Sequence, residues 1–147
     1  MHHDRAVTTH RVRDRMSREP VTVPPYTSLT AVASCMRDSD VGCVFVTSDD
    51  DELHGLVTDR DIAVRITAEG TLAGLATALQ ACSGDLVTVT PDMSVCDAAD
   101  LMSAHSVRRI PVVEERRLVG VLTLGDIADT PHAQEVLIAL SRTEANH

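Results

Sequence analysis

The sequence predicts a mixed α/β (α+β) fold built from two copies of one β-α-β-β-α unit. The first observation is size: 147 residues, of which 44% are hydrophobic, are enough for a compact core. The second is an internal repeat. When residues 21–48 are shifted by 66 and residues 53–63 by 65, 15 of 39 positions are identical. Average composition gives roughly one match in sixteen, so the repeat is not a chance similarity.

The composition also excludes several classes of protein. A net charge of −9 argues against a nucleic-acid binder, which needs basic residues to neutralise phosphates. Because no apolar run approaches the ~20 residues of a membrane span and no signal-peptide pattern opens the chain, we expect a cytoplasmic protein. Aromatic residues make up only 1%, so the core must be aliphatic.

Each copy opens with a short β-branched run, 21–23 in the first and 86–89 in the second, which ends near a proline. A helix should follow, with Ser28 and Ser94 as N-caps, and Ser94 with Asp97 fits a capping box. Apolar residues at helical spacing predict its buried face. These residues are Leu29, Val32, Ala33 and Met36 in the first copy, and Val95, Ala98, Ala99 and Met102 in the second. We expect Met36 and Met102 to occupy equivalent buried positions.

A pair of strands and a second helix complete each copy. The loop between the paired strands has five residues at 48–52 and four at 114–117, and a length change confined to a turn is typical of two copies of one unit. The second helix should begin at Thr58 and at Thr123. The expected hairpin strands are 43–47 with 54–58, and 110–113 with 118–122.

The repeat divides the chain into four segments. Residues 67–80 contain two glycines and many small residues, as linkers often do. The tail begins at Pro131 and carries a helical stripe of Val136, Leu137 and Leu140, so it should form a terminal helix. The expected segments are a first repeat at 10–66, a linker and lead-in at 67–80, a second repeat at 81–130 and a helical tail at 131–147.

The cysteines and histidines form no recognisable metal motif. Cys35, Cys43, Cys82 and Cys96 include no C-x-x-C pair, so we expect reduced and mostly buried thiols. A disulfide, and with it thiol redox sensing, stays open as an alternative. The seven histidines are scattered, which predicts no metal site. We expect no ligand role for the histidines near the ends, namely His2, His3, His10 and His147.

Both copies close with the pattern Gly-h-h-Thr-x-x-Asp-Ile, where h is apolar, at 55–62 and at 120–127. Together with the middle strands at 41–46 and 107–112 and the lead-in at 12–17, this pattern resembles the cystathionine-β-synthase (CBS) domain pair over roughly residues 10–130. The chain looks most like the short, stand-alone bacterial members. The resemblance implies a pseudo-twofold pair of repeats with two related clefts, which in many members hold adenine nucleotides or S-adenosylmethionine.

The resemblance also implies particular ligand contacts. In the family the Thr of the closing motif contacts phosphate and the Asp accepts from ribose hydroxyls, which corresponds here to Thr58 with Asp61 and Thr123 with Asp126. A strand-to-helix junction favours an anion, but Thr-x-x-Asp at a helix start is also an ordinary N-terminal cap, so both interpretations stay open. The full expected ligand-binding set is Thr22, Val41, Thr58, Arg60, Asp61, Thr88, Val107, Arg108, Arg109, Ile110, Pro111, Thr123 and Asp126.

The leading hypothesis is therefore a non-catalytic ligand sensor. It would bind AMP, ADP, ATP or S-adenosylmethionine as a regulatory ligand, form a homodimer and act in trans on an effector protein. The alternative is a constitutive scaffold without a nucleotide. No nucleophile with a recognisable base, phosphate loop or metal cluster supports an enzyme. We expect the second copy to hold the tighter site, because it has Arg108 and Arg109 where the first has Gly42 and Cys43, and lacks the acidic run at 49–52.

Overall fold

A computed structural model describes residues 10–145, so the predictions for His2, His3 and His147 lie outside the described residues. The chain divides into two compact units. The first-copy unit comprises residues 20–86 and 116–118. The second-copy unit comprises, among the described residues, 10–19, 87–115 and 119–145. None of the described helices is long and apolar enough to cross a membrane.

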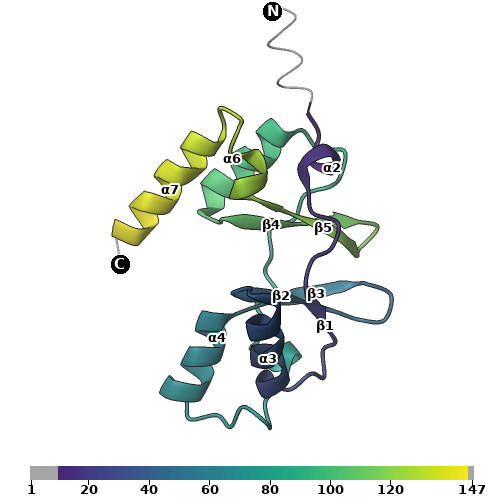
Figure 1. The fold of residues 1–147 in the computed structure, drawn as a ribbon, viewed down its shortest axis with the longest axis vertical. Coiled ribbons are helices and arrows are strands. Elements are labelled where there is room, and N and C mark those ends of the chain that lie inside the picture. Colours follow the sequence, from purple (N-terminus) through teal and green to yellow (C-terminus); the bar gives the residue numbers. More distant parts are fainter. Residues whose placement is uncertain (1–9, 146–147) are drawn as a thin grey trace, which may run out of the picture. The chain divides into compact units, whose positions relative to one another are not determined.

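The first-copy unit contains a three-stranded sheet in the order β1-β2-β3 (Figure 1). Strand β1 runs parallel to β2, and β2 and β3 form the expected antiparallel hairpin. The N-cap of α3 is Ser28, as predicted, and its hydroxyl accepts a hydrogen bond from the Ala31 N–H at 3.2 Å. The elements are β1 Thr22–Val23, α3 Leu29–Ser39, β2 Cys43–Thr47, β3 Leu53–Thr58, α4 Asp59–Ala63, the π-helix η1 Val64–Ala68 and α5 Ala78–Ala81.

The second-copy unit repeats this order with two differences. The strand predicted at 86–89 is wrong: of these residues only Val89 pairs, in a parallel bridge with Val112. In the first copy the Phe45 N–H donates to the Val21 carbonyl oxygen, but Pro111 stands in the place of Phe45 and has no N–H to donate. The closing helix is one 3-10 turn, since Pro131 prevents its continuation. The elements are α2 Val12–Arg15, α6 Val95–His105, β4 Arg109–Glu114, β5 Arg117–Thr123, η2 Leu124–Ile127 and α7 Ala133–Ala145.

The short lead-in helices are exchanged between the copies. Helix α2, which precedes the first copy, packs in the second-copy unit beside β5, where Ser17 and Val121 form an antiparallel bridge (Figure 1). Helix α5, which precedes the second copy, packs in the first-copy unit, where Ser83 pairs with Leu56 in the same way. Each unit is therefore completed by a segment that lies next to the other copy in sequence.

Two equivalent glycines make room for these lead-in segments. A Cβ atom on Gly120 would lie 2.6 Å from the Ser17 carbonyl oxygen, and one on Gly55 would lie 2.6 Å from the Ser83 carbonyl oxygen. Both distances are far below van der Waals contact, so a side chain at either position would displace the lead-in backbone. The glycine of the closing motif is thus required by the packing of the lead-in segment.

Ion pairs also attach the lead-in to the second-copy unit. Arg15 contacts Asp129, with 2.6 Å between Nη1 and Oδ1, and Arg13 pairs with Asp92. The hydrogen bond from Arg15 lowers the pKa of the Asp129 carboxyl. Since Arg13, Asp92 and Asp129 are exposed and only Arg15 is partly buried, the pairs orient the segment more than they stabilise it.

Both cores are aliphatic, as the composition predicts. Met36 is 7% exposed and Met102 is 0% exposed, which confirms the prediction that they are equivalent buried residues. Phe45 is the aromatic residue in the core, whereas Tyr26 is 77% exposed. Of the cysteines, Cys43 is buried and the other three are half-buried thiols.

Candidate functional site

The strand-to-helix junctions of the two copies have the same hydrogen-bond geometry. In the first-copy unit, the Thr58 N–H donates to Asp61 Oδ2 at 2.9 Å and the Asp61 N–H donates to Thr58 Oγ1 at 3.1 Å. The equivalent distances for Thr123 and Asp126 are 2.8 and 3.3 Å. Both pairs form reciprocal capping boxes. A capping role does not exclude ligand contact, because a carboxylate has further acceptor sites, so the ribose role of each Asp stays a prediction.

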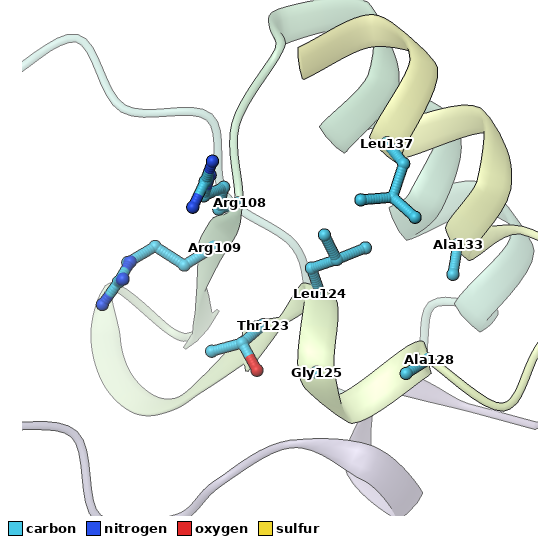
Figure 2. Close-up of a pocket in the computed structure, with 8 residues that line it drawn as sticks. All are labelled: Arg108, Arg109, Thr123, Leu124, Gly125, Ala128, Ala133 and Leu137. Atoms are coloured by element: carbon cyan, nitrogen blue, oxygen red, sulfur yellow. The ribbon is translucent and has the colours of Figure 1, made fainter. Parts of the chain in front are cut away.

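A pocket of about 460 Å³ lies beside the second of these junctions. Its volume is within the roughly 300–1,000 Å³ typical of small-molecule sites. Figure 2 shows Arg108 and Arg109 on one side and Ala133 and Leu137 on the other, with Leu124 between them. The lining residues are Arg108, Arg109, Thr123, Leu124, Gly125, Ala128, Ala133 and Leu137. The pocket therefore combines a cationic side with an apolar side.

The backbone that forms this pocket is held by an inter-element hydrogen bond. The Leu124 N–H donates to the Arg108 carbonyl oxygen at 2.8 Å, which joins the start of η2 to the residue before β4. Three residues of the expected ligand set, Arg108, Arg109 and Thr123, therefore lie around one cavity. Guanidinium groups at such a position are suited to phosphate or carboxylate, which they bind with charge-assisted hydrogen bonds.

The corresponding junction in the first copy has an acidic side chain and lacks the two arginines. The Asp59 N–H donates to the Gly42 carbonyl oxygen at 2.9 Å, which matches the bond between Leu124 and Arg108. The Asp59 carboxylate lies close above Gly42, with its Oδ2 3.3 Å from where a Cβ atom of that glycine would be. The neighbouring Arg60 is exposed. A carboxylate thus occupies the position that corresponds to a leucine in the second copy.

The other predicted site residues are distributed over several environments. Thr22 and Thr88 are exposed, whereas Ile110 is 0% exposed and belongs to the core of the second-copy unit. Pro111, next to it, is buried as well. Val41 and Val107 are half-buried, and each donates its N–H at 3.0 Å to the carbonyl oxygen of a core methionine, Met36 and Met102 respectively.

Sequence reasoning missed the apolar side of the pocket. Leu124 and Ala128 could have been predicted from the sequence as lining residues, because they follow the Thr of the closing motif at fixed offsets. Ala133 and Leu137 are not, since they lie on α7, outside the repeat. The sequence places Leu137 in a helical stripe with Val136; in the structure Leu137 is 49% exposed, while Val136 is 0% exposed.

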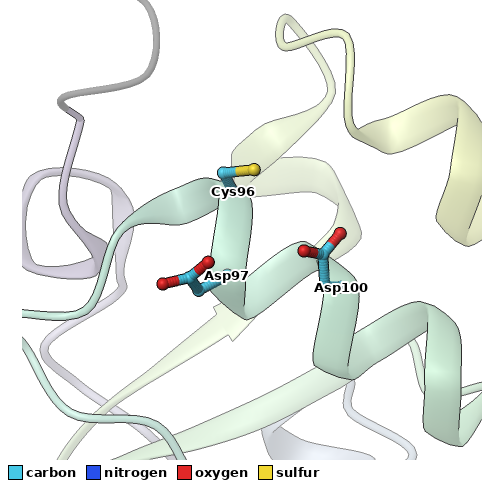
Figure 3. Close-up of side chains that lie close together, drawn as sticks. All are labelled: Cys96, Asp97 and Asp100. Carbon is cyan, nitrogen blue, oxygen red and sulfur yellow. The ribbon is translucent and has the colours of Figure 1, made fainter.

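A second group of side chains, Cys96, Asp97 and Asp100, lies at the start of α6, with ligand atoms within 4.8 Å of one another (Figure 3). Burial raises the pKa of the Cys96 thiol, and the carboxylates of Asp100, Asp97 and Glu135 raise it further. Closed zinc sites usually have four sulfur or nitrogen ligands. Three donors that include two exposed carboxylates do not fit such a site. The Asp97 N–H donates to Ser94 Oγ at 3.0 Å, so its backbone belongs to the cap of α6.

Comparison with known sequences gives one consistent match. The family model described as the CBS domain matches residues 12–68 and 79–132. Hypoxic response protein 1 of Mycobacterium tuberculosis is 40% identical over 116 residues, which are 79% of this chain and 81% of that protein. The CBS domain-containing protein YhcV of Bacillus subtilis is 40% identical over 117 residues, which are 80% of this chain and 82% of that protein.

Comparison with solved structures agrees. The crystal structure of hypoxic response protein I, described with two coordinated zinc ions, has a TM-score of 0.74 and 39% identity and covers 81% of this chain and 97% of that chain. The CBS domain pair of protein MJ0100, in complex with 5′-methylthioadenosine and S-adenosyl-L-methionine, has a TM-score of 0.69 and 25% identity. It covers 81% of this chain and 97% of that chain.

Proposed function

The chain belongs to the CBS domain family, and from this premise we propose that it is a cytoplasmic regulatory module that binds an adenine-containing nucleotide and signals in trans. CBS domain pairs are regulatory modules and are generally non-catalytic. The ligand class is AMP, ADP or ATP, with S-adenosylmethionine as a further candidate. The binding of adenosine compounds by the MJ0100 domain pair supports this class.

The observation that carries the proposal is the pocket beside Thr123. An adenine nucleotide has an anionic part and a flat, weakly polar base, and the pocket offers Arg108 and Arg109 for the first and Leu124 and Leu137 for the second. Each well-formed charge-assisted hydrogen bond contributes about 1.5–3 kcal/mol. The overall charge of −9 does not oppose binding, because a small ligand responds mainly to nearby charges.

Of the two copies, the second is the proposed principal site. The carboxylate of Asp59 repels a phosphate at the corresponding position of the first copy, and the first copy has no arginine in place of Arg108 and Arg109. Arg60 gives the first copy one exposed cation of its own. We therefore propose that the second copy binds the nucleotide more tightly.

A thermal-shift panel with AMP, ADP, ATP and S-adenosylmethionine tests the proposal. A ligand that binds only the folded state stabilises it by RT ln(1 + [L]/Kd), about 2.7 kcal/mol at a hundredfold excess over Kd. We expect at least one of the four to raise the melting temperature in a concentration-dependent manner. Adenine-free ribose 5-phosphate is the control for the base. No shift with any of the four would favour the constitutive scaffold instead.

Two matched variants, Asp126→Ala and Asp61→Ala, then assign the site. We expect Asp126→Ala to weaken binding of the stabilising ligand and Asp61→Ala to leave it nearly unchanged. Both variants remove one member of a capping box with the same geometry, so the free energies of unfolding of the unliganded proteins should fall by similar amounts, about 0.5–2 kcal/mol. The reverse pattern of affinities would assign the ligand to the first copy. Unchanged affinity in both would mean that the carboxylates are only helix caps.

Self-association is the second part of the proposal. The first-copy unit exposes large apolar side chains that a monomer would leave in water. Light scattering at micromolar concentration is expected to report a homodimer, and a monomeric mass would contradict this. The apolar side chains concerned are Tyr26 at 77%, Leu72 at 67%, Leu75 at 78% and Leu79 at 51% exposed.

A further inference from the structure

Helix α7, which lies after the second repeat, forms one wall of the pocket. Ala133 and Leu137 both line the cavity, and their spacing of four residues places them on one face of the helix (Figure 2). Among the described residues, the apolar side chains that line the cavity come from α7 and from η2 with the residue after it, which supply Leu124 and Ala128. The tail is therefore part of the candidate site.

The helix is held in this position by side chains other than Leu137. Ala133 is 7% exposed and Val136 is 0% exposed in the core of the second-copy unit, and Leu140 packs against the same core. Leu137 is not needed for this anchoring, since 49% of its surface is exposed. A change at Leu137 should therefore alter the pocket and leave the docking of α7 intact.

The two sides of the pocket define the shape of its occupant. Arg108 and Arg109 favour an anionic group, whereas Leu137 on the opposite side and Leu124 between them favour an apolar surface. We propose that α7 is a specificity element: Leu137 packs against the base of an adenine nucleotide whose phosphate contacts the arginines. This inference rests on the proposed nucleotide-binding function and adds the element that distinguishes a nucleotide from a simple sugar phosphate.

The neighbouring residue provides a matched control. Ile138 is 46% exposed, nearly the same as Leu137, and is an aliphatic side chain of equal size on the same helix, but it does not line the pocket. Leu137→Ala and Ile138→Ala therefore remove the same number of carbon atoms from equally exposed positions. A difference between them in ligand binding reports contact with the ligand and not a general effect on α7.

The experiment measures the affinities of the full chain and both variants for AMP and for ribose 5-phosphate by titration calorimetry. Loss of the Leu137 contact should weaken AMP binding roughly 5- to 10-fold, since burial of part of one leucine side chain contributes on this scale. Ile138→Ala should stay within about twofold of the parent protein, by the same scale. Neither variant should change the affinity for ribose 5-phosphate, which has no base.

The outcomes separate this inference from the function on which it rests. Equal AMP affinities of Leu137→Ala and the parent, or equal losses in both variants, would overturn the role of α7 and leave nucleotide binding standing. An equal loss for AMP and ribose 5-phosphate in Leu137→Ala would also overturn it, because the contact would then not be with the base. A parent protein that binds other adenine ligands but not AMP would likewise overturn the proposed role of α7. A parent that binds none of the four adenine ligands overturns both proposals.

Discussion

Truncation of Met102 to alanine is expected to destabilise the protein by about 2–5 kcal/mol, the usual cost of removing a large side chain from a packed core. Met102 is 0% exposed and packs in the second-copy core with small neighbours, Ala98 and Ala99. These alanines lie on the rigid helix α6 and have no side-chain length with which to fill the cavity. Thermal or denaturant unfolding should show the loss, roughly 5–20 °C in melting temperature.

Met36, the residue equivalent to Met102 in the first copy, gives an internal comparison. Met36→Ala should produce a loss of similar size in the first-copy unit, because Met36 is 7% exposed in the equivalent position. Leu75→Ala is the exposed control: Leu75 is 78% exposed, and its truncation should change stability by less than about 0.5 kcal/mol. A loss for Met102→Ala as small as that for Leu75→Ala would contradict the equivalence of the two copies.

Replacement of Arg108 and Arg109 together by glutamine should lower the affinity for AMP at least about 100-fold. Two charge-assisted contacts of about 1.5–3 kcal/mol each are lost, and 1.4 kcal/mol corresponds to a factor of ten. Both side chains line the pocket on the side opposite Leu137. Titration calorimetry with AMP measures the effect, and the unliganded melting temperature of the variant shows whether the fold is retained.

The control for this variant is the double change Arg116→Gln with Arg117→Gln. It alters the net charge by the same amount, but Arg116 lies in the turn between the hairpin strands and Arg117 at the start of β5, both exposed and outside the pocket lining. The net charge therefore changes equally in the two variants, and only the first removes charges from the pocket lining. A similar loss of AMP affinity in both would show that the arginines act through net charge alone and would contradict direct contact in the pocket.

The sequence by itself determined the repeat, the element order and the core. Side-chain periodicity is a local property, so the buried positions of Met36 and Met102 and the caps at Ser28, Thr58 and Thr123 follow from the pattern alone. It also predicted three of the residues that line the pocket, namely Thr123 from the duplicated closing motif, and Arg108 and Arg109 from their difference from Gly42 and Cys43. A local pattern does not determine which strands pair, so the strand expected at 86–89 is only a single bridge in the structure.

Only the tertiary structure decided which segments complete each unit and what closes the pocket. The exchange of α2 and α5 depends on packing between residues far apart in sequence, where the absence of a side chain at Gly55 and Gly120 admits the lead-in backbone. The place of Leu137 across the pocket from the arginines depends on how α7 docks through Val136. Helical periodicity shows that one face of α7 is apolar. Which residue of that face is buried and which lines a cavity depends on the neighbouring elements, and their positions cannot be predicted from a local sequence pattern.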